Sequence, residues 1–225
     1  MRFGVIRFPG SCDEVDAQLA CRRVGDAVIL WHRDRDLQGV DAVVIPGGFS
    51  YGDYLRAGAI ARFAPVMEEV AAFARAGGLV LGICNGFQVL CEAGLLPGAL
   101  LPNTSLRFIF RQVELQVVST DSPFTRVCAP GDRLSIPVKH TTGRYYAPPE
   151  QLAELEASRQ VLLRYAPGEN PNGSLDDIAG VCNEARNVFG LMPHPEHAVD
   201  PLLGPTGGLA IFESMRAHVE QHALV

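Results

Sequence analysis

The chain has 225 residues, a length typical of one large domain. Hydrophobic residues make up 48% of it and charged residues 20%, which fits a globular protein with a core of its own and excludes an intrinsically disordered one. The formal net charge of −6 argues against a nucleic-acid-binding protein and against a polybasic membrane anchor. We therefore expect a single globular domain that covers residues 1–225.

The six cysteines form no C-x-x-C pair, so the sequence gives no support for a zinc site or a redox dithiol. The amino-terminal apolar stretch turns polar at Arg7, before the core of a secretory signal could form. No apolar run approaches the roughly 18–20 residues that a membrane-spanning helix needs. We therefore expect a cytoplasmic protein with reduced thiols. Lys139 is the only lysine among 19 basic residues, and we expect it to be a partly exposed strand residue.

Short apolar runs alternate with helical patterns in the first half of the chain. Strands are predicted at 3–8, 27–31, 41–45 and 79–83. Helices are predicted from a cap at Asp13 to about residue 24, over 55–76 with a break near Pro65, and over 85–93. This alternation favours a parallel sheet with right-handed crossovers.

The second half is less regular. Antiparallel strands are predicted at 108–118 and 134–140, followed by a helix over 149–157 and by strands at 161–165, 178–183 and 188–192. Residues 183–187 fit a hairpin turn, and a final helix is predicted from 208 to about 222. We therefore expect an α/β fold with a mostly parallel central sheet, flanking helices and additional antiparallel strands.

Cys84 stands in the sequence GICNGFQ (82–88), where a buried strand meets a helix. Glycines on either side permit the tight backbone turn that this position needs, and the thiol would project from the carboxyl edge of the sheet. A helix amino terminus favours the thiolate, which is the nucleophilic form of cysteine. Cys84 is therefore the candidate nucleophile, although a buried structural cysteine is the simpler interpretation of any single cysteine.

A base for such a nucleophile is offered by MPHPE (192–196), 110 positions downstream. Histidine titrates near neutrality, which suits proton transfer. Glu196 is two residues beyond His194 and could accept a hydrogen bond from its imidazole along an extended chain. His197 is a local competitor, and only the spacing to a carboxylate favours His194.

The sequence PGGFSYGD (46–53) ends another predicted strand at the same edge of the sheet. A Gly-Gly pair lets a backbone N–H turn toward a developing oxyanion, and Asn85, directly after Cys84, could supply a second donor. Taken alone, Pro-Gly-Gly is usually only a turn.

Together these motifs resemble those of the class I (triad) glutamine amidotransferases. Within that family the similarity is greatest to a small, separately encoded glutaminase subunit, and it covers nearly the whole chain. The similar segments are GGFSYGDYLRAG (47–58), GICNGFQ (82–88), NGS (172–174), DIAG (177–180) and MPHPE (192–196). The resemblance implies a flavodoxin-like three-layer sandwich.

The resemblance also implies a division of labour among the site residues. Cys84 would attack the side-chain amide of glutamine, giving a γ-glutamyl thioester and ammonia. His194 would move the protons and Glu196 would orient it. Backbone N–H groups at Gly48 and Asn85 would hold the oxyanion.

The same resemblance implies the substrate contacts and the partners. Glutamine would be contacted by Gln88, Phe49, His140 and Thr141. No metal and no cofactor is expected on this chain. Ammonia would pass to a separate synthetase subunit that uses ATP and magnesium to convert formylglycinamide ribonucleotide to its amidine, and a small third subunit would bridge the two.

One segment departs from the family pattern. Members of the family often have His-Gly-Glu-Gly where this chain has HTTG (140–143). Backbone contacts to glutamine would survive this change, but a contact through the missing glutamate would not.

Three alternatives remain open at the level of sequence. The chain could be a glutaminase subunit that serves another acceptor, a cysteine chaperone, deglycase or protease on the same scaffold, or a binding module that has lost catalysis. The run FSYGD (49–53) disfavours the first, by resemblance. The His-Pro-Glu sequence disfavours the second, and the intact set of Cys84, His194 and Glu196 disfavours the third.

Overall fold

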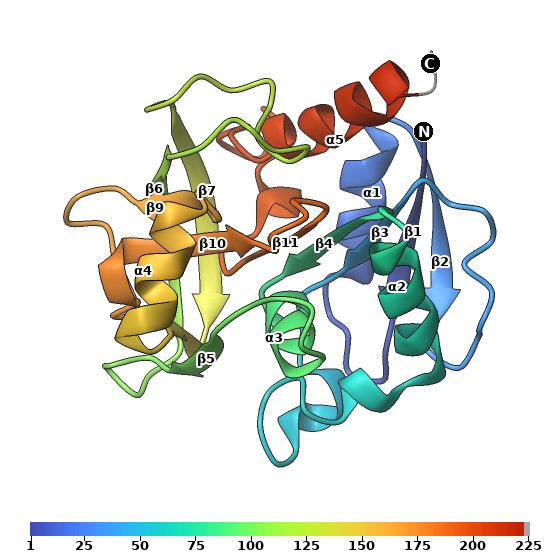
Figure 1. Ribbon diagram of the computed structural model, residues 1–225, viewed down its shortest axis with the longest axis horizontal. Coiled ribbons are helices and arrows are strands. Elements are labelled where there is room, and N and C mark those ends of the chain that lie inside the picture. Colours follow the sequence, from blue (N-terminus) through green and yellow to red (C-terminus); the bar gives the residue numbers. More distant parts are fainter. Residues whose placement is uncertain (223–225) are drawn as a thin grey trace.

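A nine-stranded mixed sheet runs through the computed structural model, which describes residues 1–222 (Figure 1). Its five mutually parallel strands are, in spatial order, β2 (Asp26–Trp31), β1 (Arg2–Arg7), β3 (Ala42–Ile45), β4 (Leu79–Ile83) and β11 (Val188–Leu191). Four antiparallel strands continue the sheet, namely β10 (Ile178–Cys182), β9 (Val161–Tyr165), β6 (Ile109–Val117) and β7 (Arg133–His140). The expected combination of parallel and antiparallel strands is confirmed, as is the hairpin between β10 and β11.

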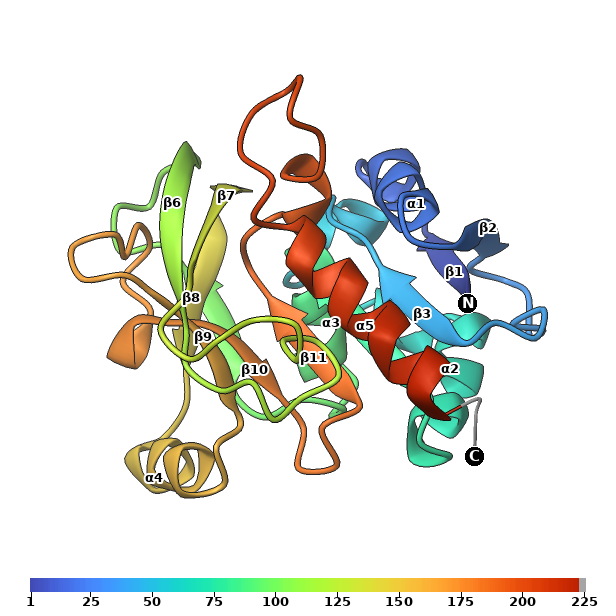
Figure 2. The same cartoon turned by 90° about the horizontal axis from the view of Figure 1, so that it is seen from above.

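Helices cover both faces of the parallel half. Every residue of β3 and β4 is buried, as the apolar sequences AVVI and LVLGI predict for strands covered on both faces. Figures 1 and 2 show α1 (Glu14–Arg22) and α5 (Leu209–His222) on one face, and α2 (Pro65–Arg75) and α3 (Asn85–Glu92) on the other. The expected three-layer α/β sandwich is therefore confirmed, with α4 (Pro149–Ala157) packed beside the antiparallel half.

The strand order fixes where a ligand can bind. The chain moves outward from β1 to β2, and then returns to the other side of β1 with β3 and β4. At such a reversal the loops that follow neighbouring strands separate and leave a crevice at the carboxyl ends. The segments after β1, β3, β4 and β11 all meet there, and the loop between β3 and α2 projects at the lower edge of Figure 1.

The helix predicted over 55–76 is wrong in its first half. Within residues 55–76 the α-helical part is α2, which starts at Pro65, a residue whose ring suits the first turn of a helix. Two short 3₁₀ turns, η1 (Ser50–Asp53) and η2 (Ala61–Phe63), precede it. Positive φ angles at Leu55 (70°) and Gly58 (80°) prevent a continuous helix despite the helical spacing of the alanines.

A second sheet was not predicted. It pairs β5 (Ala99–Pro102) with β8 (Thr142–Tyr146), and β8 begins only one residue after β7 ends. Thr141 is the one residue between β7 and β8, and it is neither Gly nor Pro, so nothing at that position indicates that a second strand begins. The sequence therefore predicted β7 but not β8. The transition matters because Thr141, at the junction, belongs to the predicted substrate-binding segment.

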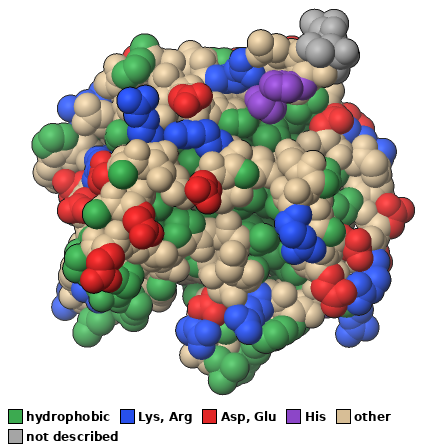
Figure 3. All heavy atoms as spheres, viewed as in Figure 1, with side chains coloured by type: hydrophobic (Ala, Val, Ile, Leu, Met, Phe, Trp, Pro, Cys, Tyr) green, Lys and Arg blue, Asp and Glu red, His purple; other side chains and the backbone are tan. Residues whose placement is uncertain are grey.

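The surface carries charges of both signs. On the face shown in Figure 3, acidic and basic side chains are interspersed rather than gathered into a patch of one sign. Within residues 1–222, no helix combines the length and the apolar character that crossing a membrane requires.

Candidate active site

A cleft lies at the carboxyl ends of the parallel strands and encloses about 430 Å³, part of which is open to solvent. The cleft is lined by Cys12, Asp13, Gly48, Phe49, Asp53, Cys84, Gln88, Phe108, Lys139, His140, Thr141, Thr142 and His194. Seven of the nine predicted site residues are in this set, and the other two, Asn85 and Glu196, are buried close to it.

Cys84 occupies a sharp turn between β4 and α3. Its backbone has φ 50° and ψ −104°, which a non-glycine residue rarely adopts. Its N–H donates to the carbonyl of Leu191 (2.8 Å), so the turn is anchored on the neighbouring strand β11. The side chain is 6% exposed and faces the cleft at the amino terminus of α3. A strained, anchored thiol in this position has the geometry of a nucleophile.

The glycines beside Cys84 allow α3 to approach the sheet. A Cβ on Gly86 would lie 1.9 Å from the carbonyl oxygen of Ile45, and one on Gly82 would lie 2.5 Å from Leu90 Cδ1. Both positions therefore need glycine for close packing. The sequence predicted that glycine is needed on both sides of Cys84, and the structure shows that the need comes from the lack of space for a side chain.

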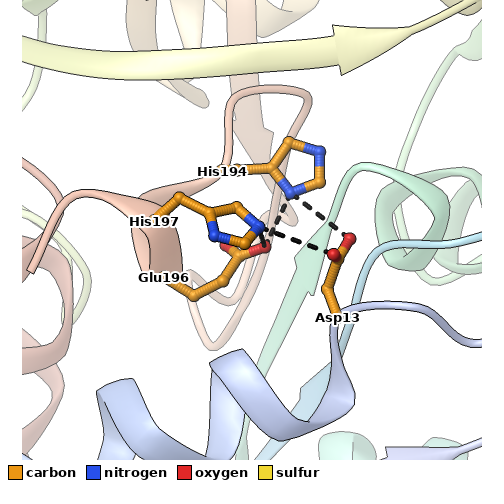
Figure 4. Close-up of side chains that lie close together, drawn as sticks. All are labelled: Asp13, His194, Glu196 and His197. Carbon is orange, nitrogen blue, oxygen red and sulfur yellow. Dashed lines mark hydrogen bonds and ion pairs between the residues drawn. The ribbon is translucent and has the colours of Figure 1, made fainter. Parts of the chain in front are cut away.

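His194 follows β11 and is fully buried. Its Nδ1 lies 2.6 Å from Glu196 Oε1, which is buried as well (Figure 4). Figure 4 shows the other ring nitrogen, Nε2, pointing away from the carboxylates, and within residues 1–222 no group lies in hydrogen-bonding geometry to it. Burial opposes a charge on the ring, but the Glu196 carboxylate and the Cys84 sulfur outweigh burial and raise the pKa of His194 to about 10. Of the two candidate histidines, it is therefore His194 rather than His197 that shares a close hydrogen bond with Glu196.

The predicted oxyanion donors lie at the ends of two neighbouring strands. Asn85 is the first residue of α3, and its N–H is one of the first-turn groups that no carbonyl within the helix can accept. Gly48 has φ 140°, and a Cβ on it would lie 2.6 Å from the backbone nitrogen of Cys12. Gly48 therefore needs to be glycine.

The loop that carries Gly48 is tied to the nucleophile helix. Ser50 N–H donates to Asn85 Oδ1 (3.0 Å), and Asn85 Nδ2 donates to Asp53 Oδ1 (3.2 Å). On the other side of the loop, the hydroxyl of Tyr51 lies 2.7 Å from His32 Nδ1. These contacts hold a loop whose backbone is strained at Tyr51 and Asp53, both with positive φ.

Gln88 acts as a support for the cleft wall. Its Nε2 donates to the Thr142 carbonyl (2.6 Å), and its Oε1 accepts from Asn85 Nδ2 (2.8 Å). Both ends of its amide are therefore used inside the protein, although the side chain also lines the cleft. The structure thus places Gln88 between the nucleophile helix and the segment 140–143.

Segment 140–143 is held mainly through its backbone. Asn103 Nδ2 donates to the His140 carbonyl (2.9 Å), and Asn103 Oδ1 accepts from Gly143 N–H (3.1 Å). Asn172 Nδ2 donates to the Gly143 carbonyl (2.8 Å) from the opposite side. Because these contacts use backbone atoms, they do not depend on the side chains of Thr141 and Thr142.

His140 is neutral in this setting. Burial lowers the pKa of His140 to about 3, with a smaller contribution from His194. Its Nε2 lies 3.1 Å from Asn172 Nδ2, and its Nδ1 is buried without a partner. Thr141 is exposed at the cleft and Phe49 is 46% exposed at its rim.

Comparison with known proteins agrees with this geometry. The model of the CobB/CobQ-like glutamine amidotransferase domain matches residues 1–215. The chain belongs to this glutamine amidotransferase family. It is 62% identical over 218 residues to "phosphoribosylformylglycinamidine synthase subunit PurQ" of Rubrobacter xylanophilus (96% of this chain, 98% of that protein). It is 60% identical over 215 residues to the protein of the same name from Mycobacterium tuberculosis (95% of both chains).

Solved structures extend the comparison. A chain in the structure of PurLQS from Thermotoga maritima has a TM-score of 0.89 and is 42% identical, over 97% of this chain and 98% of that one. A second Thermotoga maritima protein, described as a glutamine amidotransferase, has a TM-score of 0.55 at 17% identity, over 100% and 86% of the two chains, and supports the fold alone. The family and fold expected from the motifs are confirmed.

Six residues that line the cleft were not predicted as site residues, namely Cys12, Asp13, Asp53, Phe108, Lys139 and Thr142. Among them, Asp13 contacts His194. Asp13 occupies the expected position before α1, but its side chain makes no capping hydrogen bond and faces His194 instead (Figure 4). The helix-cap interpretation is therefore wrong for the side chain. Its place in the segment that connects β1 to α1, at the carboxyl edge of the sheet, was the signal that could have identified it.

The ligand atoms of Asp13, His194, Glu196 and His197 lie within 4.8 Å of one another. Such spacing could hold a divalent cation. However, Asp13 is already paired with the ammonium group of Lys139 (2.5 Å), and His194 Nδ1 is bonded to Glu196. A cation would have to displace a positive charge that the chain itself supplies, so we assign no metal to this cluster.

Proposed function

We propose that this chain is the glutaminase subunit of phosphoribosylformylglycinamidine synthase and that Cys84, His194 and Glu196 carry out the hydrolysis of glutamine. The observation that supports the proposal best is the meeting of a strained cysteine and a buried His–Glu pair in one cleft. High identity over almost the full length of proteins named for that subunit supports the assignment to this enzyme rather than to another amidotransferase.

In the first half of the reaction, His194 Nε2 takes the proton of the Cys84 thiol as Cys84 Sγ adds to the side-chain amide carbon of glutamine. The N–H groups of Gly48 and Asn85 stabilise the oxyanion that forms, and a preorganised donor of this kind contributes about 3 kcal/mol. His194 protonates the amide nitrogen through Nε2, the C–N bond breaks, and ammonia leaves a γ-glutamyl thioester.

In the second half, water attacks the thioester. His194 accepts a proton from the water, the C–S bond breaks, and glutamate leaves as the thiol is restored. Glu196 holds Nδ1 throughout, which keeps Nε2 facing the reacting atoms. We further propose that Gln88, Phe49, His140 and Thr141 shape the glutamine-binding part of the cleft.

The ammonia is used elsewhere. We propose that it passes to a synthetase subunit, which binds ATP and magnesium and converts formylglycinamide ribonucleotide to the amidine, and that a small third subunit bridges the two. The name PurLQS of the similar solved structure supports an assembly of this kind. We also propose a cytoplasmic location, which the six free cysteines support.

The decisive experiment replaces Cys84 by alanine in the assembled enzyme. Amidine formation should be lost with glutamine as the nitrogen donor and retained with ammonia. Full glutamine-dependent activity in Cys84→Ala would disprove the proposed mechanism. Cys91→Ala, a partly buried cysteine on α3, serves as the matched control and should retain both activities.

Covalent labelling gives an independent measurement. An electrophilic glutamine analogue should modify Cys84, and peptide mass spectrometry should locate the adduct there. Cys12 is the sharpest internal control because it is exposed and also lines the cleft. An adduct on Cys12 that persists in Cys84→Ala, with none on Cys84 in the unchanged protein, would contradict the assignment.

A further inference from the structure

Asp13 is a buried carboxylate that the mechanism above does not use. It lies directly before α1, where an aspartate ordinarily accepts a hydrogen bond from the first N–H groups of the helix, yet its side chain makes no such bond. Only 3% of the residue is exposed. The carboxylate instead points toward His194 (Figure 4). A buried charge that forgoes a helix cap needs compensation from elsewhere.

That compensation comes from three nitrogen atoms. Lys139 Nζ lies 2.5 Å and His197 Nε2 3.5 Å from Asp13 Oδ1, while His194 Nδ1 lies 3.6 Å from Asp13 Oδ2. Burial raises the pKa of the Asp13 carboxyl, but the contacts with His197, His194 and Lys139 outweigh it and hold that pKa well below its usual range. Asp13 therefore remains ionised beside the imidazole of His194.

His194 thus faces two carboxylates on the same side of its ring. Glu196 bonds Nδ1 directly, and Asp13 lies about one ångström further away. Both favour the protonated imidazole, and a base that holds its proton too firmly transfers it poorly. The ammonium of Lys139 offsets the charge of Asp13. Other titratable side chains face this cluster as well, namely Cys12, Cys21, Cys84, His140 and His197.

The arrangement also depends on the backbone. A Cβ on Gly47 would lie 2.3 Å from Asp13 Oδ2 and 2.7 Å from His194 Cε1, so only glycine leaves room for the two side chains to meet. Lys139 contributes twice, because its ammonium pairs with Asp13 while its carbonyl oxygen lies 3.9 Å from Cys84 Sγ and accepts the thiol hydrogen bond. One ion pair therefore connects the surroundings of the base and of the nucleophile.

We propose that Asp13 and Lys139 are positioning residues of this active site. The Lys139 ammonium balances the negative charge that Asp13 places beside His194, so that the imidazole can both take up and release a proton. The inference rests on the proposed function, since proton transfer by His194 belongs to glutamine hydrolysis. It adds a charge-balancing pair to the three residues of the triad.

The test compares four proteins: the unchanged chain, Asp13→Asn, Lys139→Met and the double variant. The first readout is the pKa of His194 in the full chain, followed by the NMR shifts of labelled histidine and assigned by the loss of its signal in His194→Gln. Asp13→Asn removes a nearby negative charge and leaves Lys139 unbalanced, so the pKa should fall by about one unit or more. In the double variant it should recover part of that fall, because the unbalanced positive charge is gone.

Lys139→Met alone should move the pKa of His194 in the opposite direction, upward, because Asp13 loses its partner. Arg133→Met, on the same strand but exposed, removes one positive charge away from the cleft and should leave the pKa unchanged. The inference is overturned if Asp13→Asn leaves the pKa within about 0.3 unit of its starting value, if the double variant equals Asp13→Asn, or if Lys139→Met lowers the pKa. If Lys139→Met does not fold, Lys139→Gln takes its place with the same expectations.

The second readout is the alkaline limb of the pH profile of kcat/KM for glutamine hydrolysis by the assembled enzyme. The pKa of this limb should shift in each variant in the same direction as the NMR pKa of His194. In Lys139→Arg, which keeps the positive charge, it should equal that of the unchanged enzyme. The two readouts separate the two hypotheses. An unchanged enzyme that does not hydrolyse glutamine contradicts the proposed function, whereas a limb that stays fixed while glutamine is hydrolysed contradicts the role of the ion pair.

Discussion

Gln88 Nε2 donates a hydrogen bond to the carbonyl oxygen of Thr142 across 2.6 Å, and this contact joins the helix of the nucleophile to the opposite wall of the cleft. Gln88 belongs to α3, which packs on the parallel half of the sheet, and Thr142 is the first residue of β8. The distance between nucleophile and substrate-binding segment therefore depends on one side-chain amide.

Removing that amide should weaken substrate binding more than it slows the chemical step. Gln88→Ala leaves the partly buried Thr142 carbonyl without its donor, a loss of about 1 kcal/mol or more, so we expect the KM for glutamine to rise roughly tenfold. Steady-state kinetics of the assembled enzyme will measure KM and kcat separately. Gln151→Ala, on α4, is the control and should change neither. A lower kcat at unchanged KM would contradict this interpretation.

Asn172 should contribute to stability through the same segment. Its amide nitrogen donates to the Gly143 carbonyl, and its oxygen accepts from the backbone and hydroxyl of Ser174. Asn172→Asp places an acceptor where a donor is needed in a fully buried position, so we expect a loss of about 2 kcal/mol or more in the free energy of unfolding. Urea denaturation measures the loss. Gln112→Glu introduces the same charge on the exposed part of β6 and should have little effect.

Gly86 tests the close packing of the nucleophile helix. An alanine there would place its Cβ 1.9 Å from the backbone oxygen of Ile45, so we expect a destabilisation of about 3 kcal/mol and a loss of activity. Gly131→Ala is the comparison, because φ is 90° at that position and no atom lies within 4 Å of the added carbon. It should cost about 1 kcal/mol through backbone strain alone. Equal thermal shifts in the two variants would show that crowding at α3 is unimportant.

His194 should make stability depend on pH. Its pKa is raised from 6.5 to about 10 in the folded protein, so its contribution is complete below 6.5 and is lost as the pH rises through about 10. We therefore expect the unfolding midpoints of the unchanged protein and of His194→Gln to converge as the pH rises over that interval. Urea titrations at several pH values will test this. A difference that stays constant or grows with pH contradicts the elevated pKa.

The sequence predicted the candidate catalytic set because its residues follow recognisable strand ends. Cys84 comes after a buried strand and before a helix, so local pattern was sufficient there. His194 and Glu196 were expected along an extended chain, but Pro195–His197 form a 3₁₀ turn, and this turn brings the Glu196 carboxylate to His194 Nδ1. The parallel strands were likewise predicted from local pattern, since continuous apolar runs such as 42–45 and 79–83 are distinctive.

The parts that were missed depend on contacts between distant segments. Asp13 could equally have capped its own helix, and only the folded chain shows that Lys139, 126 residues away, takes its carboxylate instead. The turn that separates β7 from β8 is a single residue, which no local pattern marks. The helix predicted over 55–76 is wrong only before Pro65, where the alanine spacing is helical but Leu55 and Gly58 adopt positive φ.

The pairing of β4 with β11 has a consequence for how this scaffold can change. Nucleophile and base leave adjacent parallel strands at the same end, so strand spacing of about 4.8 Å fixes their separation. The intervening part of the chain also contacts the reactive pair, because β7 supplies the Pro137 carbonyl that accepts from His194 N–H (2.8 Å) and the Lys139 carbonyl that accepts from Cys84 Sγ. A different segment grafted in place of 109–146 would therefore have to keep these contacts of β7 in order to alter which ligand is held and leave the reactive pair in register.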